Sequence, residues 1–314
     1  MLKKLGFTSM LVLTAAIWGF AFVAQVIAAQ SDGIGNFTFN GIRFLLGALS
    51  LIPVMLVFER KGYADRQKVS STFVYGAVTG VILFAAATLQ QFGAEFTNSS
   101  GKSGFITCLY TVLVPVISFL LFRKKTGANV WIAAVVSLAG LYMLCMVSEK
   151  FTFGKGEWLL FAGALMWSAH ILVIDRWSQN ISPLLFSFAQ FVTCGLLSII
   201  SAFIFEDVNL AGIWEVRYPI LYGGLMSVGV AYTLQVVGQR HADPTVAAIV
   251  LSCESLFSAI GGLLILNEDL GTFGYVGCAV MFAGVIISQI DVASFKKLFT
   301  ARKRTDTNNT EAKL

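Results

Sequence analysis

The hexapeptide TLQQFG at residues 88–93 returns as TLQVVG at residues 233–238, with four of the six residues unchanged. The two copies lie 145 residues apart in a chain of 314 residues, which is close to half its length. A similarity at this spacing indicates that the chain is built from two related halves.

Further matches at similar spacing extend along most of the chain. Trp18 corresponds to Trp167, 149 residues later, and Phe44 corresponds to Phe191. Near the end of each half, AAVVSLAG at residues 133–140 corresponds to GCAVMFAG at residues 277–284, an offset of 144. We therefore expect a first half at residues 1–148 and a second half at 149–295. A basic tail at 296–314 is polar and lacks apolar periodicity, so we expect it to be disordered.

The composition predicts that both halves lie in a lipid bilayer. Hydrophobic residues make up 57% of the chain and charged residues 12%, whereas a soluble domain carries roughly 25% charged residues. A membrane helix needs about 20 mostly apolar residues, and ten stretches of this kind are present. They are residues 8–29, 37–58, 73–93, 101–122, 129–147, 157–175, 183–204, 217–237, 245–266 and 272–290. We expect an all-α integral membrane protein with ten transmembrane helices.

The basic residues predict how these helices are oriented. With the N-terminus in the cytoplasm, 17 of the 22 Lys and Arg residues fall on the cytoplasmic side and only three on the opposite side. Because positive residues are retained in the cytoplasm, we expect both termini there and the protein in the cell membrane. The first apolar run exceeds the core of a typical signal peptide, so we expect it to remain as a helix.

The odd number of helices in each half determines how the halves are related. Five crossings carry the chain to the other side of the membrane, so the second half starts outside if the first starts inside. The halves would then be inverted repeats around a pseudo-two-fold axis in the membrane plane. Secondary transporters use this plan to open one central site alternately to either side. We expect a transporter, and the alternative is a duplicated structural membrane protein without transport activity.

Several motifs resemble the drug/metabolite transporter superfamily, EamA type. They are Trp-Gly at residues 18–19, Arg-Phe at 43–44, GKSGFITCLYTVLVPVISFLLF at 101–122 and AAIVLSCESLFSAIGGLLILNEDL at 247–270. The resemblance covers nearly all of the chain up to about residue 290, although family members commonly carry Pro where this chain has Leu256. It implies transport of small solutes such as amino acids, sugars, nucleotide-like metabolites or drugs, often outward. It does not identify the substrate.

Charged residues within membrane helices are costly to bury and are therefore candidates for function. Glu254 lies near the middle of the ninth stretch and could bind a substrate amine or carry a proton. The other interpretation is a hydrogen-bonded glutamate that only joins helices. Arg43 and Lys102 lie toward the outer face, where they could attract a carboxylate or extend to the interface. With Glu254, they would suit a zwitterion such as an amino acid.

Gln90 and Gln235 occupy the same place in the two hexapeptides. They could line a central site from both halves, or they could form an interhelical hydrogen bond. His170 could relay protons together with Glu254, or it could simply hydrogen-bond a neighbour. Proton coupling is thus an option for this transporter.

Three aromatic residues are further candidates for lining the cavity. Trp18 and Trp167 occupy matching positions well inside a helix of each half, and Tyr110 lies within the fourth stretch. Aromatic residues in membrane helices more often pack or mark the interface. The repeat favours the two tryptophans.

The competing functional classes have little support. The sequence contains no HExxH, GxSxG or GxxxxGK[ST] motif, so we expect neither an enzyme nor an ATPase. A channel is the other alternative, but an inverted repeat favours a gated central site. The five cysteines lie in apolar stretches without CxxC spacing. We expect no metal or other cofactor and no nucleic-acid partner. The expected partners are a small-molecule substrate and membrane lipid, with protons as an option. A homodimer is also an option, although no pattern in the sequence supports it.

Overall fold

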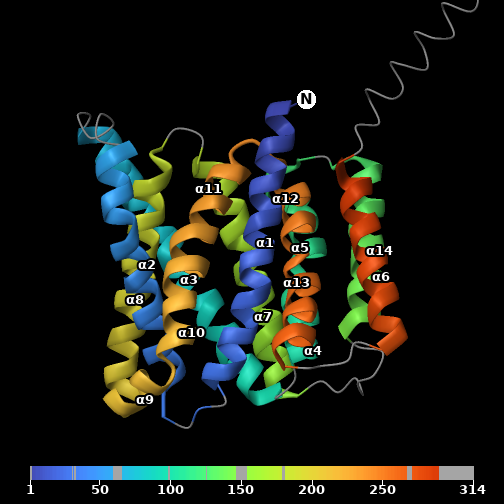
Figure 1. Ribbon diagram of the computed structural model, residues 1–314. Helices are drawn as coiled ribbons and strands as arrows, with labels where there is room; N and C mark the ends of the chain where they lie inside the picture. The colour runs from blue at the N-terminus through green and yellow to red at the C-terminus, as the bar shows by residue number, and fades with distance from the viewer. Residues whose placement is uncertain are drawn as a thin grey trace, which may run out of the picture.

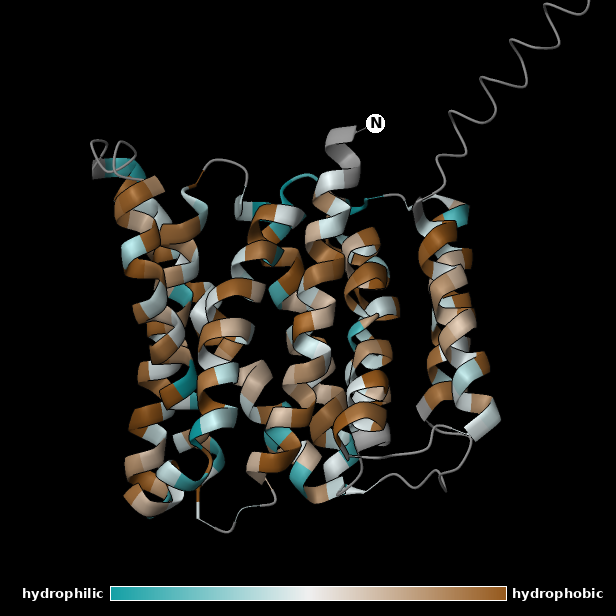
Figure 2. Ribbon diagram, viewed as in Figure 1, coloured by the Kyte–Doolittle hydropathy of each residue, from teal (hydrophilic) through white to brown (hydrophobic). Residues whose placement is uncertain are grey.

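The computed structural model describes residues 2–29, 31, 33–58, 66–97, 100–124, 126–145, 154–178, 181–266 and 271–289. These residues form a bundle of helices, and the described part of the chain contains no strand (Figure 1). A helix satisfies its backbone hydrogen bonds internally, as a chain surrounded by lipid requires. Hydrophobic residues run along most of the length of the helices in Figure 2.

The helices are divided between the two halves of the chain. The first half contains α1 (Leu2–Ala29), α2 (Asn36–Phe58), α3 (Arg66–Thr97), α4 (Ser100–Thr107), α5 (Tyr110–Phe122) and α6 (Ala128–Cys145). The second half contains α7 (Lys155–Trp177), α8 (Pro183–Phe205), α9 (Leu210–Glu215), α10 (Arg217–Leu221), the π-helix η3 (Tyr222–Tyr232), α11 (Thr233–Gln239), α12 (Pro244–Leu251), α13 (Glu254–Gly261), the π-helix η4 (Gly262–Leu266) and α14 (Gly271–Gln289).

Nine helical segments in the described residues are long and apolar enough to cross a membrane. The fifth predicted stretch, residues 129–147, corresponds to α6, where the shorter apolar helix Ala128–Leu144 is described. The outer surface also suits lipid, because Val57, Phe58, Leu121 and Phe203 are each at least 70% exposed. The protein is therefore a multi-pass membrane protein.

The helix α1 begins and α14 ends at the same edge of the bundle, which is the upper edge in Figure 1. We call this the N-terminal edge and the opposite one the far edge. The pairs α2–α8 and α6–α14 form the two ends of the bundle, and the remaining helices lie between them (Figure 1). Glycines allow such close pairing: a Cβ atom added at Gly140 of α6 would lie 2.5 Å from the backbone nitrogen of Met281 in α14.

Two of the predicted membrane helices are interrupted near their middle. The fourth stretch breaks between α4 and α5, and the ninth breaks between α12 and α13. At each break a backbone N–H donates to the carbonyl three residues earlier, from Leu109 to Ile106 and from Cys253 to Val250, both at 3.2 Å. Such tight turns inside a helix often accompany functional sites. Tyr110 and Glu254 are the first residues after the two breaks.

Candidate functional site

A cavity lies between the two interrupted helices and the central helices. The cavity has a volume of about 40 Å³, which is room for a few water molecules. Seven of the eight predicted binding residues line it, namely Trp18, Arg43, Gln90, Tyr110, Trp167, Gln235 and Glu254. The eighth, Lys102, belongs to α4, but its side chain lies outside those that the structure describes.

The cavity extends from the middle of the bundle toward the far edge. Phe22 and Gln25, which line it, lie in the last two turns of α1, and Arg43 lies in the second turn of α2. Toward the N-terminal edge the lining reaches Ile171 of α7 and Leu251 of α12. The cavity therefore spans the centre of the molecule and the half nearer the far edge.

Glu254 is held in the cavity wall by neutral groups. Its Oε1 accepts hydrogen bonds from the Tyr110 hydroxyl at 3.0 Å and from Cys108 Sγ at 3.5 Å. The residue is only 6% exposed, and none of the described basic side chains forms an ion pair with it. A carboxyl group in this position must therefore be neutralised by a proton or by a bound cation.

Arg43 places a guanidinium group in the same cavity, and it is only 4% exposed. Its Nε donates to Asn40 Oδ1 at 2.9 Å, and its Cζ lies 4.9 Å from the centre of the Phe44 ring. Within the described part of the chain, no carboxylate pairs with it. The cavity thus contains one basic and one acidic residue that do not neutralise each other.

Aromatic rings form a second wall of the cavity. Tyr232 lies 4.6 Å from Trp18 and 6.2 Å from Trp167 between ring centres. The Trp167 indole N–H donates to Gln90 Oε1 at 2.7 Å, and the Trp18 indole N–H donates to the Ser227 carbonyl at 3.3 Å. These bonds orient both indoles, so the wall offers flat apolar faces to the cavity.

The two repeated glutamines have different partners. Gln90 is bonded to Trp167, whereas Gln235 Oε1 is buried without a hydrogen-bond partner among the described residues. Because a buried amide oxygen is costly when unpaired, Gln235 is the side chain in this wall that most needs a ligand or water.

His170 lies outside the cavity lining. It is fully buried, and its Nε2 lies 3.0 Å from Gln190 Oε1. The rings of Trp167 and Tyr232 stand perpendicular to it, with centres 5.8 and 6.1 Å away. The structure therefore places the predicted proton carrier behind the aromatic wall and not beside Glu254.

Sequence reasoning missed about half of the lining. The additional residues are Phe22, Gln25, Thr107, Ile171, Ser227, Tyr232 and Leu251. Tyr232 directly precedes the second copy of the repeated hexapeptide, so its position in the sequence could have indicated that it lines the cavity. Gln25 carries an amide like Gln90 and Gln235, but it has no counterpart in the repeated hexapeptide. The remaining residues are apolar or small polar side chains that a membrane helix carries on every face. Among the described residues, no three His, Cys, Asp or Glu side chains come together as a metal site would require.

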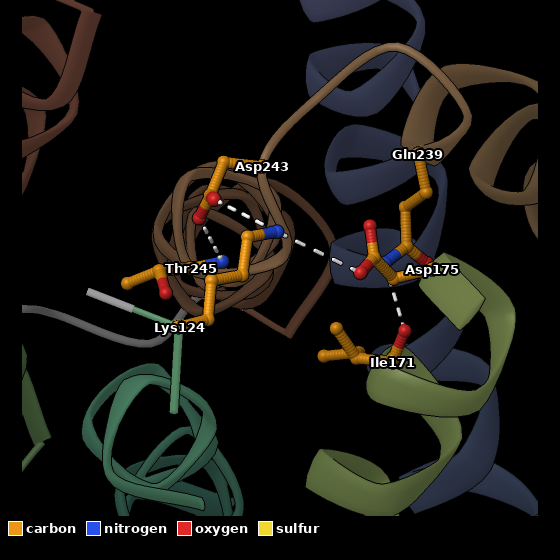
Figure 3. Close-up of polar contacts among 6 residues, drawn as sticks. All are labelled: Lys124, Ile171, Asp175, Gln239, Asp243 and Thr245. Carbon is orange, nitrogen blue, oxygen red and sulfur yellow. Dashed lines mark hydrogen bonds and ion pairs between the residues drawn. The ribbon is translucent and has the colours of Figure 1, made fainter. Parts of the chain in front are cut away.

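A cluster of charges also lies at the N-terminal edge, where the sequence had suggested only topology signals. Lys124 Nζ lies 3.1 Å from Asp243 Oδ2 and 3.7 Å from Asp175 Oδ2 (Figure 3). Lys124 follows α5, Asp175 lies in the last turn of α7, and Asp243 precedes α12. One ammonium group therefore joins the ends of three helices.

Most of the chain is similar to one family of known proteins. The model of the EamA-like transporter family matches the chain twice, over residues 7–146 and 154–289. The chain belongs to the EamA-like transporter family. This is a family of transporters, not of enzymes, and the cavity described above lies within a membrane transporter of the EamA-like type.

Relatives of this EamA-like protein carry similarly general names. An uncharacterized transporter of Archaeoglobus fulgidus is 28% identical over 282 residues, covering 90% of this chain and 85% of that protein. The uncharacterized transporter YetK of Bacillus subtilis is 24% identical, covering 92% and 88%. The WAT1-related protein At3g18200 of Arabidopsis thaliana is also 24% identical, covering 86% and 77%. A protein of known crystal structure has a TM-score of 0.73 at 16% identity, covering 89% and 95%, and this likeness shows the fold alone.

Proposed function

We propose that the protein is a secondary transporter that carries a small zwitterionic metabolite, such as an amino acid, across the cell membrane by alternating access. One observation carries the proposal: the Tyr110 hydroxyl donates to Glu254 inside the cavity. These residues are the first after the two helix breaks and are 144 residues apart, the offset that also relates Gly140 to Gly284. If a two-fold axis relates the two halves, matched positions can contact each other only at that axis, so this hydrogen bond would lie there.

The backbone around the two breaks supports such an axis. Four hydrogen bonds of the first break recur at the second with both partners shifted by 144 residues. They are Cys108 to Gly104, Leu109 to Ile106, Thr111 to Cys108 and Leu113 to Leu109, matched by Ser252 to Ala248, Cys253 to Val250, Ser255 to Ser252 and Phe257 to Cys253. Interrupted helices that meet near the bilayer midplane are typical of transporter binding sites.

The helix contacts exchange in the same way. A Cβ atom at Gly140 would lie 2.5 Å from the Met281 nitrogen, and one at Gly284 would lie 2.9 Å from the Ser137 nitrogen. Positions 137 and 281 differ by the same 144 residues as the two glycines. The glycine of each half therefore packs against the matching residue of the other half, as expected of inverted repeats.

The opening hexapeptides fit this pattern too. Gly93 ends the first copy, and a Cβ there would lie 2.6 Å from Leu160 Cγ. Gly238 ends the second copy, and a Cβ there would lie 2.9 Å from Leu11 Cδ2. Leu11 and Leu160 are 149 residues apart, the same offset as the two tryptophans. Our proposal includes ten membrane crossings arranged as inverted repeats, with the N-terminal edge in the cytoplasm.

The substrate class follows from the two charges in the cavity. Glu254 would bind the ammonium group of the substrate, and Arg43 would bind its carboxylate. Charges buried in the membrane are retained mainly where a ligand or ion uses them. The rings of Trp18, Trp167 and Tyr232 would contact the apolar part of the substrate. Sugars, nucleotide-like metabolites and drugs are the alternatives, and they would leave one or both charges unused.

Energy coupling is proposed at Glu254. A proton on this carboxyl group and the ammonium group of a substrate cannot occupy it together, so binding of one would release the other. Outward movement of substrate and inward movement of protons would then alternate on one group, which suits an exporter. His170 would take part only if water connected it to the cavity past Tyr232 and Trp167.

The test is counterflow in proteoliposomes with a set of matched solutes. A carrier preloaded with substrate accelerates uptake of the labelled substrate, whereas a channel does not. We expect acceleration with an amino acid, and less with its decarboxylated and deaminated analogues. Equal acceleration by all three would remove the zwitterion assignment. The amino acid is chosen by comparing the extracellular metabolites of expressing cells, cells with Glu254→Ala and vector controls.

A further inference from the structure

The charges at the N-terminal edge connect parts of the molecule that alternating access would move apart. Lys124 belongs to the first half of the chain, whereas Asp175 and Asp243 belong to the second. The ammonium group reaches both carboxylates, at 3.7 and 3.1 Å (Figure 3). The contact therefore spans the boundary between the halves.

The charge cluster also lies directly beyond the end of the cavity. Ile171 lines the cavity and stands one helical turn before Asp175 on α7. Between the cavity and the charges, Gln239 Nε2 donates to the Ile171 carbonyl at 3.3 Å (Figure 3). Access from the N-terminal edge to the cavity would have to pass these contacts.

We propose that Lys124, Asp175 and Asp243 form a gate that closes the cavity at the N-terminal edge. Opening to this side separates Lys124 from Asp243, so the end of α5 leaves the start of α12. The proposal rests on the transport function proposed above, because a gate has meaning only for a site that changes its access.

The chemistry of the cluster suits a contact that must break in every cycle. The side chains of Lys124, Asp175 and Asp243 are 43%, 27% and 41% exposed. Ion pairs with this exposure contribute little net stability, since water replaces the partner when they separate. A buried apolar seal of the same extent would be costlier to open. The gate would bias the closed state without locking it.

Asp243 also caps a helix, and the test must separate this structural role from gating. Its Oδ1 accepts a hydrogen bond from the Thr245 N–H at 2.9 Å, so it caps α12. Asparagine is an equally good helix cap. Asp243→Asn therefore removes the charge and keeps the cap, whereas Asp243→Ala would remove both.

The experiment measures access without needing a substrate. Ile171→Cys in the full chain serves as a reporter, and a membrane-impermeant maleimide is added from the side of the N-terminal edge. The chain without this change gives the background of the native cysteines. We expect Lys124→Gln and Asp243→Asn to speed labelling about two- to fivefold, the effect of up to about 1 kcal/mol. Lys124→Arg keeps the positive charge and leaves the Asp243 cap of α12 intact, so it should keep the slow rate.

Arg176→Gln is the matched control. Arg176 neighbours Asp175 and is exposed, and no ion pair is described for it. Its loss should leave labelling unchanged. The gate is refuted if Lys124→Gln leaves the rate unaltered, if Arg176→Gln raises it equally, or if Lys124→Arg labels as fast as Lys124→Gln in a protein that elutes as a monodisperse species. If labelling responds as expected but no solute shows counterflow, the gate stands and the proposed transport function fails.

Discussion

The two helix breaks share their backbone hydrogen bonds but differ in the side chain that follows. Both turn with the same hydrogen bonds, yet the first residue after the break is Tyr110 in one half and Glu254 in the other. The matching positions on α2 and α8 also carry different side chains. Arg43 lines the cavity with a charged group, while the neutral Gln190 bonds His170 in the core. Small residues and tight turns thus preserve the shape of each half, and the polar side chains are free to diverge.

This difference explains how two similar helix breaks can offer an asymmetrical site. Two carboxylates in contact at these positions would repel each other, and two tyrosines would provide no charge. One tyrosine and one glutamate instead give a hydrogen-bonded pair with a single acidic group. Arg43 then supplies the opposite charge from one half only. Such a cavity can distinguish the two ends of a substrate.

The largest expected effect separates the two residues at the breaks. Glu254→Gln should lower transport at least about 30-fold, because removing one partner of a buried charge pair costs about 2–5 kcal/mol. Tyr110→Phe removes only a hydrogen bond and should cost about two- to tenfold. Initial rates of counterflow measure both. The remaining transport of Glu254→Gln should no longer depend on pH.

Glu157 provides the control for this pair. It is about as buried as Glu254, at 7% against 6%, but it caps α7 by accepting the Gly154 N–H at 2.9 Å. Glu157→Gln should therefore leave transport close to the starting rate. If Tyr110→Phe and Glu254→Gln prove equally damaging, the asymmetry between the breaks has no functional meaning.

The next effect concerns the second asymmetrical position. Arg43→Gln gives α2 the residue that α8 carries at position 190, and it removes the proposed partner of the carboxylate. We expect about a 10-fold weaker competition by amino acids, the loss of a charged hydrogen bond, and no change for the decarboxylated amines. Competition against labelled substrate measures this. Arg217→Gln is the control, since Arg217 also lies over an aromatic ring, that of Trp214 at 5.0 Å.

The shared frame predicts equal effects where the halves are alike. Gly140→Ala and Gly284→Ala each place a Cβ atom within 3 Å of the opposite backbone. Each should lower stability by about 1–3 kcal/mol, the usual cost of overpacking, and by similar amounts. Thermal unfolding in detergent would show this, with Gly6→Ala as control because nothing lies within 4 Å there. Clearly unequal losses would argue against equivalent contacts.

The smallest effect is expected at the edge of the bundle. Asp175 lies farther from Lys124 than Asp243 does, at 3.7 against 3.1 Å. Asp175→Asn should therefore speed labelling of the Ile171→Cys reporter by less than about twofold, within the range for weak exposed pairs. A larger effect than that of Asp243→Asn would reverse the order of the two contacts.

The sequence by itself determined that this is a helical membrane protein, and it named several of the polar side chains at its centre. Long apolar stretches must cross the bilayer as helices, and charged or amide groups within them must turn away from lipid. This is why Arg43, Gln90, Gln235 and Glu254 could be named before the structure, and all four line one cavity.

Only the tertiary structure decided which helix faces meet. A membrane helix is apolar on nearly every side, so its periodicity does not reveal the face that packs against a neighbour. The place of His170 behind the aromatic wall, the role of Tyr232 between two tryptophans, and the contact of Lys124 with Asp175 and Asp243 all depend on such meetings. Each joins residues that are far apart in the chain and become neighbours only when the helices assemble.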